Sequence, residues 1–150
     1  MAKRILLIDD DEDDRLFFCE ALKEVAPEII CNTTEDGRKA LAKLNNQEIE
    51  PPHLIFLDVN MPVMSGWQCL CVLKERDAYK HIPVIMYSTS SHREDINKAQ
   101  QLGALCFFTK PCVFKELKKS LAIVAQHLHS NSLSSLMLNS SLFVVPETLS

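Results

Sequence analysis

Five short apolar segments alternate with longer amphipathic segments along this chain, and the alternation limits the folds that it can adopt. The four central positions of the segments at residues 4–9 and 53–58 are all apolar, and the first segment is typical of a strand buried on both faces. Turn-forming residues such as Pro51 and Pro52 separate the segments. We therefore expect strands at residues 4–9, 28–33, 53–58, 83–88 and 105–109.

The segments between and after these strands have the apolar spacing of amphipathic helices. The last one carries apolar residues three and four positions apart, at Phe114, Leu117, Leu121, Val124 and Leu128. Five successive strand–helix units predict an α/β fold with a doubly wound parallel sheet, whose ligand site lies beyond the carboxyl ends of the strands. The expected helices cover residues 13–26, 36–44, 65–77, 92–102 and 114–128.

Charge and the length of the apolar runs exclude several classes of protein. The chain has 150 residues and a net charge of −4, whereas nucleic-acid-binding domains usually carry a basic surplus. The lysines within residues 115–119 are interrupted by Glu116 and Leu117, and we interpret them as a solvated helix face. No apolar run approaches the ~18 residues of a membrane span, and residues 5–8 are too few for a signal peptide. We expect a cytoplasmic protein that binds neither nucleic acid nor membrane.

Six cysteines are spread along the chain without a C-x-x-C pair. In a reducing compartment such thiols commonly serve as small hydrophobic side chains. We interpret them as buried free thiols without a metal or redox role. They are Cys19, Cys31, Cys69, Cys71, Cys106 and Cys112.

Carboxylates stand at the ends of two expected strands. The first strand ends in Asp9 and Asp10, and the third ends in Asp58. If these strands are neighbours, the carboxylates converge and raise one another's pKa, and a cation offsets their charge. Clustered carboxylate oxygens with room for water suit Mg²⁺. Asp11 is a further candidate for binding the metal, but the register of the first strand favours Asp9 and Asp10. The acidic run 9–14 also has the composition of a helix N-terminus.

A hydroxyl and an ammonium stand at the two remaining strand ends. The fourth strand ends in Ser88, and Lys110 follows the fifth. Carboxylates, a hydroxyl and an ammonium at one edge of a sheet suit the transfer of a phosphoryl group to an aspartate. In this interpretation Asp58 is the nucleophile, the metal and Lys110 neutralise phosphoryl oxygens, and Ser88 hydrogen-bonds the product.

These motifs resemble the receiver domains of bacterial response regulators, with the similarity covering residues 3–129. The resemblance implies a flavodoxin-like sheet of five parallel strands in the order 2-1-3-4-5 with five helices. It also implies a stand-alone domain similar to the chemotaxis regulators. The similarity rests on Ile8-Asp9-Asp10, on Leu57-Asp58-Val59-Asn60-Met61-Pro62 followed by Gly66, on Ser88, and on Lys110-Pro111.

The resemblance implies a metal-binding role for four residues. Asp9 and Asp10 resemble the acidic pair that organises Mg²⁺, and Asp58 resembles the phosphoacceptor that also contacts the metal. The backbone carbonyl of Asn60 would complete the metal shell.

Three further positions have implied roles in response to phosphorylation. Lys110 resembles the lysine that pairs with the phosphoryl group, and its bond to Pro111 resembles one that is cis in the family. Ser88 resembles the switch hydroxyl. Phe107 stands where the family often has a switch tyrosine, so the ring is kept and the hydroxyl is lost.

The implied activity is that of a phosphoacceptor signalling domain rather than an enzyme acting on other substrates. Such a domain catalyses only its own phosphorylation and dephosphorylation. Its implied partners are a histidine kinase or histidine phosphotransfer protein and a downstream protein target. A homodimer through the fourth helix, fifth strand and fifth helix, or through the C-terminal tail, is also expected.

Residues 130–150 differ in composition from the expected receiver domain at residues 1–129. This tail contains seven serines and no Lys or Arg, and it is too short for a separate output domain. It also contains apolar residues such as Leu136 and the run at 142–145, which a disordered segment usually lacks. We expect the tail to pack on an apolar surface, preferably the face of the fourth and fifth helices, in the same subunit or across a homodimer.

Three alternative interpretations stay open at this point. A haloacid-dehalogenase-type enzyme also uses an aspartyl nucleophile with Mg²⁺, but it normally has a second Asp where this chain has Asn60. A flavodoxin-like cofactor binder needs a loop rich in Ser, Thr and Gly after the first strand, where this chain is acidic. The third alternative is a receiver that docks without phosphorylation, and the intact acidic site counts against it.

Overall fold

The computed structural model describes residues 2–90 and 92–137, which form a five-stranded parallel sheet. The strand order β2-β1-β3-β4-β5 confirms the doubly wound, flavodoxin-like topology. Neighbouring strands pair in parallel throughout. The strands are β1 (Arg4–Ile8), β2 (Ile30–Thr34), β3 (Leu54–Asp58), β4 (Val84–Ser88) and β5 (Cys106–Thr109).

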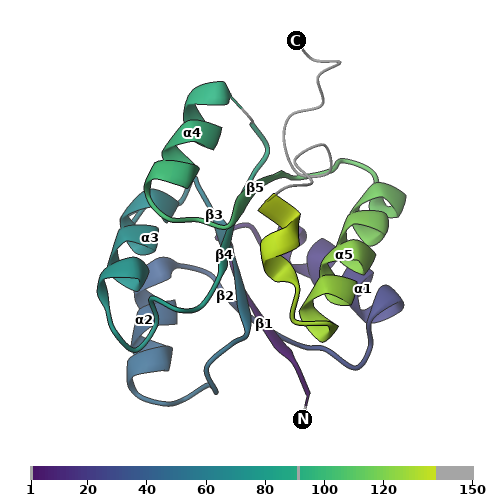
Figure 1. Ribbon diagram of the computed structural model, residues 1–150, viewed down its shortest axis with the longest axis horizontal. Helices are drawn as coiled ribbons and strands as arrows, with labels where there is room; N and C mark the ends of the chain where they lie inside the picture. Colours follow the sequence, from purple (N-terminus) through teal and green to yellow (C-terminus); the bar gives the residue numbers. More distant parts are fainter. Residues whose placement is uncertain (1, 91, 138–150) are drawn as a thin grey trace.

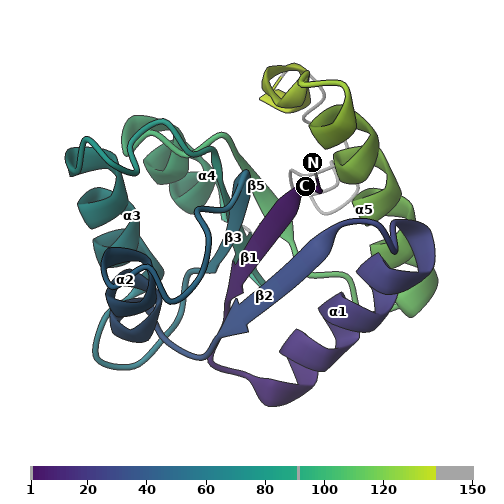
Figure 2. The same ribbon diagram turned by 90° about the horizontal axis from the view of Figure 1, so that it is seen from below.

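Helices cover both faces of the sheet. Helices α1 and α5 lie on one face, and α2, α3 and α4 lie on the other (Figure 1). Figure 2 shows the same layers from below, with α1 beside α5. The helices begin and end within about two residues of their expected bounds. They are α1 (Glu12–Val25), α2 (Gly37–Asn45), α3 (Gly66–Glu75), α4 (Arg93–Gln101) and α5 (Phe114–His129), followed by the 3₁₀ helix η1 (Leu133–Met137).

The central strands are buried because each face packs against helices. On the α1/α5 face, Phe18 belongs to a cluster of four rings whose paired centroids lie 4.9–5.9 Å apart, in edge-to-face pairs that favour aromatic contact; the other three rings come from three strands. Those rings belong to Phe56, Tyr87 and Phe108. On the other face, aliphatic residues of β1, β3 and β4 pack with α2, α3 and α4. The edge strand β2 is more exposed.

Side-chain caps fix the start of three helices. Asp11, Asp36 and Ser65 each accept the backbone N–H three residues later, at 3.0, 2.7 and 3.2 Å. The Gln68 side chain accepts the Ser65 N–H in return, which completes a capping box. The caps of α1 and α3 hold the loops that follow β1 and β3.

The beginning of the C-terminal tail packs on the core of its own chain. Leu136 of η1 is fully buried, and Leu133 is partly buried against the same apolar cluster on the α1/α5 face. Residues 138–150 lie outside the described residues, so the expectation for the rest of the tail stays a prediction. Within residues 2–90 and 92–137, no helix is both long enough and apolar enough to cross a membrane.

Candidate functional site

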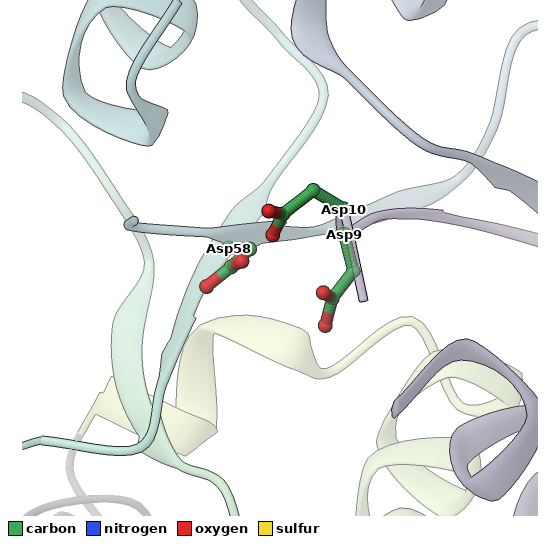
Figure 3. Close-up of side chains that lie close together, drawn as sticks. All are labelled: Asp9, Asp10 and Asp58. Atoms are coloured by element: carbon green, nitrogen blue, oxygen red, sulfur yellow. The ribbon is translucent and has the colours of Figure 1, made fainter. Parts of the chain in front are cut away.

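Three carboxylates meet at the carboxyl edge of the sheet. Asp9 and Asp10 directly follow β1, and Asp58 ends the neighbouring strand β3. One oxygen of each lies within 4.8 Å of the others, and the close-up shows the three side chains gathered at the strand ends (Figure 3). The convergence expected from the sequence therefore follows from the pairing of β1 with β3.

Two of these carboxylates are buried, which perturbs their ionisation. Asp9 is 0% exposed and Asp58 is 5% exposed, whereas Asp10 faces solvent. Burial raises the pKa of Asp9, and it raises the pKa of Asp58 to about 7, where the charge of Lys110 acts in the opposite direction. The charge of Asp9 raises the pKa of Asp58 further. The two buried carboxylates, Asp9 and Asp58, therefore favour binding of a cation.

Lys110 enters the same space from the loop after β5. Its Nζ lies 2.8 Å from Asp9 Oδ2, 2.8 Å from Asp14 Oδ2 and 3.6 Å from Asp58 Oδ1. It also lies 5.0 Å from the centre of the Tyr87 ring. Burial lowers the pKa of Lys110, but its contacts with Asp14 and Asp9 outweigh burial and hold the pKa above its ordinary value. The ammonium is therefore a permanent positive charge beside Asp58.

The acidic cluster has the oxygen donors that a hard divalent cation needs. Asp9 Oδ2 is buried and accepts no hydrogen bond of regular geometry within the described residues, although the Lys110 ammonium lies at ion-pair distance. Such an oxygen retains lone pairs for a metal. Carboxylates from two strands beside open solvent at Asp10 fit Mg²⁺, which keeps part of its water shell.

Ser88 and Phe107 occupy different surroundings. Ser88 ends β4 next to β3, is 1% exposed, and its Oγ accepts the Ser90 N–H at 3.3 Å. Its carbonyl accepts the Lys110 N–H at 2.7 Å, so Ser88 and Lys110 are joined through the backbone. Phe107 is 1% exposed and packs in the cluster under α2, α3 and α4. Ser88 thus lies at the carboxyl end of β4, beside the end of β3, and Phe107 lies within the core.

The loop between β3 and α3 packs directly on the backbone of Asp58. A Cβ atom at Gly66 would lie 2.1 Å from the Asp58 carbonyl oxygen, so only glycine fits there. The Gly66 N–H also donates to the Val59 carbonyl at 2.9 Å. Asn60 stands exposed in this loop, two residues beyond Asp58.

Two residues near the site were not identified from the sequence. Asp14 was included only in the acidic helix start, yet its carboxylate takes one Lys110 contact. Arg15 Nη1 donates to the Asp9 carbonyl at 2.8 Å. Both contacts depend on how α1 lies against β1 and β5, for which the sequence carries no local signal. The resemblance implied a cis Lys110–Pro111 bond, and this was wrong. The bond is trans, like every peptide bond in the described part of the chain.

Comparison with known proteins identifies a family whose members are similar to this chain over most of its length. The chain matches the family model of the response regulator receiver domain over residues 5–122. It is 33% identical over 127 residues to protein PilG of Pseudomonas aeruginosa, covering 85% of this chain and 88% of PilG.

Solved structures with at least 29% identity have the same fold. The phosphorylated cyanobacterial phytochrome response regulator RcpA has a TM-score of 0.79 and 29% identity, covering 87% of this chain and 96% of RcpA. The Mn²⁺-bound form of response regulator Rcp1 has a TM-score of 0.74 and 30% identity, covering 83% of this chain and 92% of Rcp1.

The family model spans most of the chain, including the acidic cluster, Ser88 and Lys110. The match excludes the dehalogenase and flavodoxin-like cofactor-binding alternatives. Sheet order, site geometry and sequence similarity agree, and the chain belongs to the response regulator receiver domain family.

Proposed function

We propose that this receiver domain accepts a phosphoryl group on Asp58, with Mg²⁺ held by Asp9, Asp10, Asp58 and the Asn60 carbonyl. The observation that carries the proposal is the contact set of Lys110, whose ammonium lies 3.6 Å from Asp58 Oδ1 within a cluster of three carboxylates. The similar proteins RcpA, whose structure is of a phosphorylated form, and Rcp1, whose structure is of a Mn²⁺-bound form, add support.

The reaction transfers the phosphoryl group from a phosphohistidine nitrogen to Asp58. An oxygen of the ionised Asp58 carboxylate attacks phosphorus, the phosphorus–nitrogen bond breaks, and the histidine ring leaves with a proton from solvent. Bound Mg²⁺ would supply positive charge that screens the carboxylates and the phosphoryl oxygens. Lys110 binds a phosphoryl oxygen of the product, and Ser88 Oγ donates a hydrogen bond to another.

The chain then acts as a signalling domain through a change in its surface. Ser88 and Phe107 are the proposed switch residues, and the Lys110–Ser88 backbone bond offers a connection from the phosphoryl group to β4 and β5. Its proposed partners are a histidine kinase or phosphotransfer protein and a downstream target in the cytoplasm. Catalysis would be limited to its own phosphorylation and dephosphorylation. Pairing of two copies through α4, β5 and α5 stays a prediction.

The test measures the mass of the intact protein after incubation with a small-molecule phosphodonor and Mg²⁺. We expect wild type to gain one phosphoryl group, and we expect no gain with excess chelator. Asp58→Asn should gain none, because the amide has nearly the same shape but is a poor nucleophile. Asp77→Asn is the matched control, since Asp77 has a 94% exposed side chain in the turn that follows α3. Equal phosphorylation of Asp58→Asn and wild type would refute the assignment of Asp58, and a wild-type protein that gains no phosphoryl group would favour the docking receiver.

A further inference from the structure

Two cysteine thiols meet away from the acidic site. Cys19 lies in α1 and Cys31 in β2, and their Sγ atoms are 3.3 Å apart. Both side chains are half-buried rather than enclosed. Cys31 lies on the edge strand β2 and packs, partly buried, against the apolar cluster of the α1/α5 face. The sequence separation of 12 residues gave no motif by which to predict this contact.

The other four cysteines have different surroundings. Cys69 is buried, Cys71 and Cys106 are half-buried, and Cys112 is exposed, contrary to the expectation that all six are buried. None of these four contacts another thiol within the described residues. The arrangement of Cys19 and Cys31 is therefore specific to that pair.

We propose that Cys19 and Cys31 form a reversible intramolecular disulfide by exchange with a small-molecule disulfide. A disulfide needs an S–S distance of ~2.05 Å, so the sulfur atoms have to approach by only about 1 Å. The inference is independent of phosphorylation at Asp58.

The exchange takes place in two steps and conserves atoms and electrons. The Cys19 thiolate attacks one sulfur of the small disulfide, which breaks its S–S bond and releases one thiolate. Cys31 loses its proton to solvent and attacks the Cys19 sulfur, which releases the second thiolate. Both released thiolates take up protons. The two protein thiols are thus oxidised by two electrons, and the small disulfide is reduced to two thiols.

The surroundings of the two cysteines indicate which thiol reacts first with the small disulfide. The hydrogen bond from Cys31 lowers the pKa of the Cys19 thiol to about 7, burial opposes it, and the Arg15 charge assists it. The hydrogen bond to Cys19, together with burial, raises the pKa of Cys31. Cys19 is the attacking thiolate because the charge of Arg15, on the same helix, favours its ionised form, and Cys31 is the resolving thiol because it packs against the apolar cluster.

The test uses the full chain carrying Cys112→Ser, which removes the exposed thiol that could cross-link two molecules. The folded protein is incubated with oxidised glutathione, alkylated, digested and mapped by mass spectrometry. We expect a Cys19–Cys31 disulfide, loss of two free thiols, and full recovery with dithiothreitol. Adding Cys31→Ser should trap a glutathione adduct on Cys19, and adding Cys19→Ser should prevent disulfide formation.

Circular dichroism checks that each variant is folded before oxidation. Cys71→Ser in the same background is the matched control, and it should form the Cys19–Cys31 disulfide at the rate of the parent. The proposal is overturned if both thiols stay alkylatable in the parent, or if Cys19 accumulates only the glutathione adduct while Cys31 is present.

Discussion

In the proposed reaction, Asp14 would compete with the phosphoryl group on Asp58 for Lys110. An ammonium has three N–H donors, and Asp9 and Asp14 each lie 2.8 Å from Nζ, closer than Asp58 at 3.6 Å. Because Asp14 is the more exposed of the two close partners, it can release Lys110 when Asp58 is phosphorylated. Asp14 is thus a positioning residue that tunes how readily Lys110 reaches the product.

We expect Asp14→Asn to speed phosphorylation of Asp58 by a small-molecule donor about two- to fivefold, because a partly exposed ion pair is weak. Rates are measured by intact mass at fixed donor and Mg²⁺ concentrations. Glu12→Gln removes an exposed charge from the same helical turn and is the matched control. A slower Asp14→Asn reaction, or equal acceleration in Glu12→Gln, would show that the specific contact does not limit the reaction.

The raised pKa of Asp58 predicts a pH dependence of stability. A carboxyl whose folded-state pKa is about 7, against 3.8 when unfolded, binds its proton more tightly in the folded state. Its contribution to stability is full below pH 4 and is lost as pH rises through 7. Without divalent metal, we expect Asp58→Asn to raise the free energy of unfolding by about 2–4 kcal/mol at pH 8.

The stabilisation gained by Asp58→Asn should shrink as pH falls from 7 toward 4. In that range the wild-type Asp58 carboxyl is protonated in the folded state and so no longer places a charge in the site. Urea denaturation at pH 8 and pH 5 in the presence of chelator measures both values, with Asp77→Asn as the control. A gain that is the same at both pH values would contradict the burial of a charged Asp58.

At the scale of elements, the start of α3 lies close against the backbone at the end of β3. A Cβ at Gly66 would meet the Asp58 carbonyl oxygen at 2.1 Å and the Val59 Cα at 2.8 Å, and neither atom can rotate away. We expect Gly66→Ala to lower the free energy of unfolding by about 1–3 kcal/mol and to slow phosphorylation, because α3 must move.

Gly37→Ala is a suitable comparison, because the Cβ there would meet side-chain atoms of Met64 and Cys69 at 3.1–3.2 Å. Those side chains can shift, so the cost measured by urea denaturation should be smaller. Equal costs for the two variants would show that the loop before α3 adapts as easily as a side chain.

The elements were predictable because each carries a periodic signal of its own. The apolar runs of β1 and β3 and the three- and four-residue spacing of α5 place strands and helices to within about two residues. The contacts of Asp14 with Lys110 and of Cys19 with Cys31 span different elements. No local pattern encodes such contacts, because they depend on how α1 is oriented against the sheet.

At the scale of the whole molecule, the site exists only when the chain is folded. Asp10 and Asp58 come from distant parts of the sequence and meet through the pairing of β1 with β3. A ligand that binds only the folded state raises stability by mass action. At saturating Mg²⁺ we therefore expect the Tm to rise by about 5–10 °C.

Asp10→Asn should remove most of that rise while leaving the Tm without metal nearly unchanged, because Asp10 is exposed. Asp13→Asn, an exposed change in the first turn of α1, should keep the full rise. The Tm is followed by circular dichroism with and without chelator. Retention of the full Mg²⁺ effect by Asp10→Asn would contradict its place in the metal shell.

The strand order illustrates what periodicity alone leaves open. Five strand–helix units with right-handed crossovers are compatible with several orders of strands. The order 2-1-3-4-5 was expected from the resemblance carried by residues such as Asp58 and Lys110, and the sheet confirms it.

Burial of Asp9 and Asp58 beside each other also has an evolutionary consequence. Like charges in a buried cluster oppose folding of the metal-free chain, so neutral substitutions there stabilise the protein. In a laboratory selection for abundant, heat-resistant protein alone, these two positions should be among the first to lose their acids.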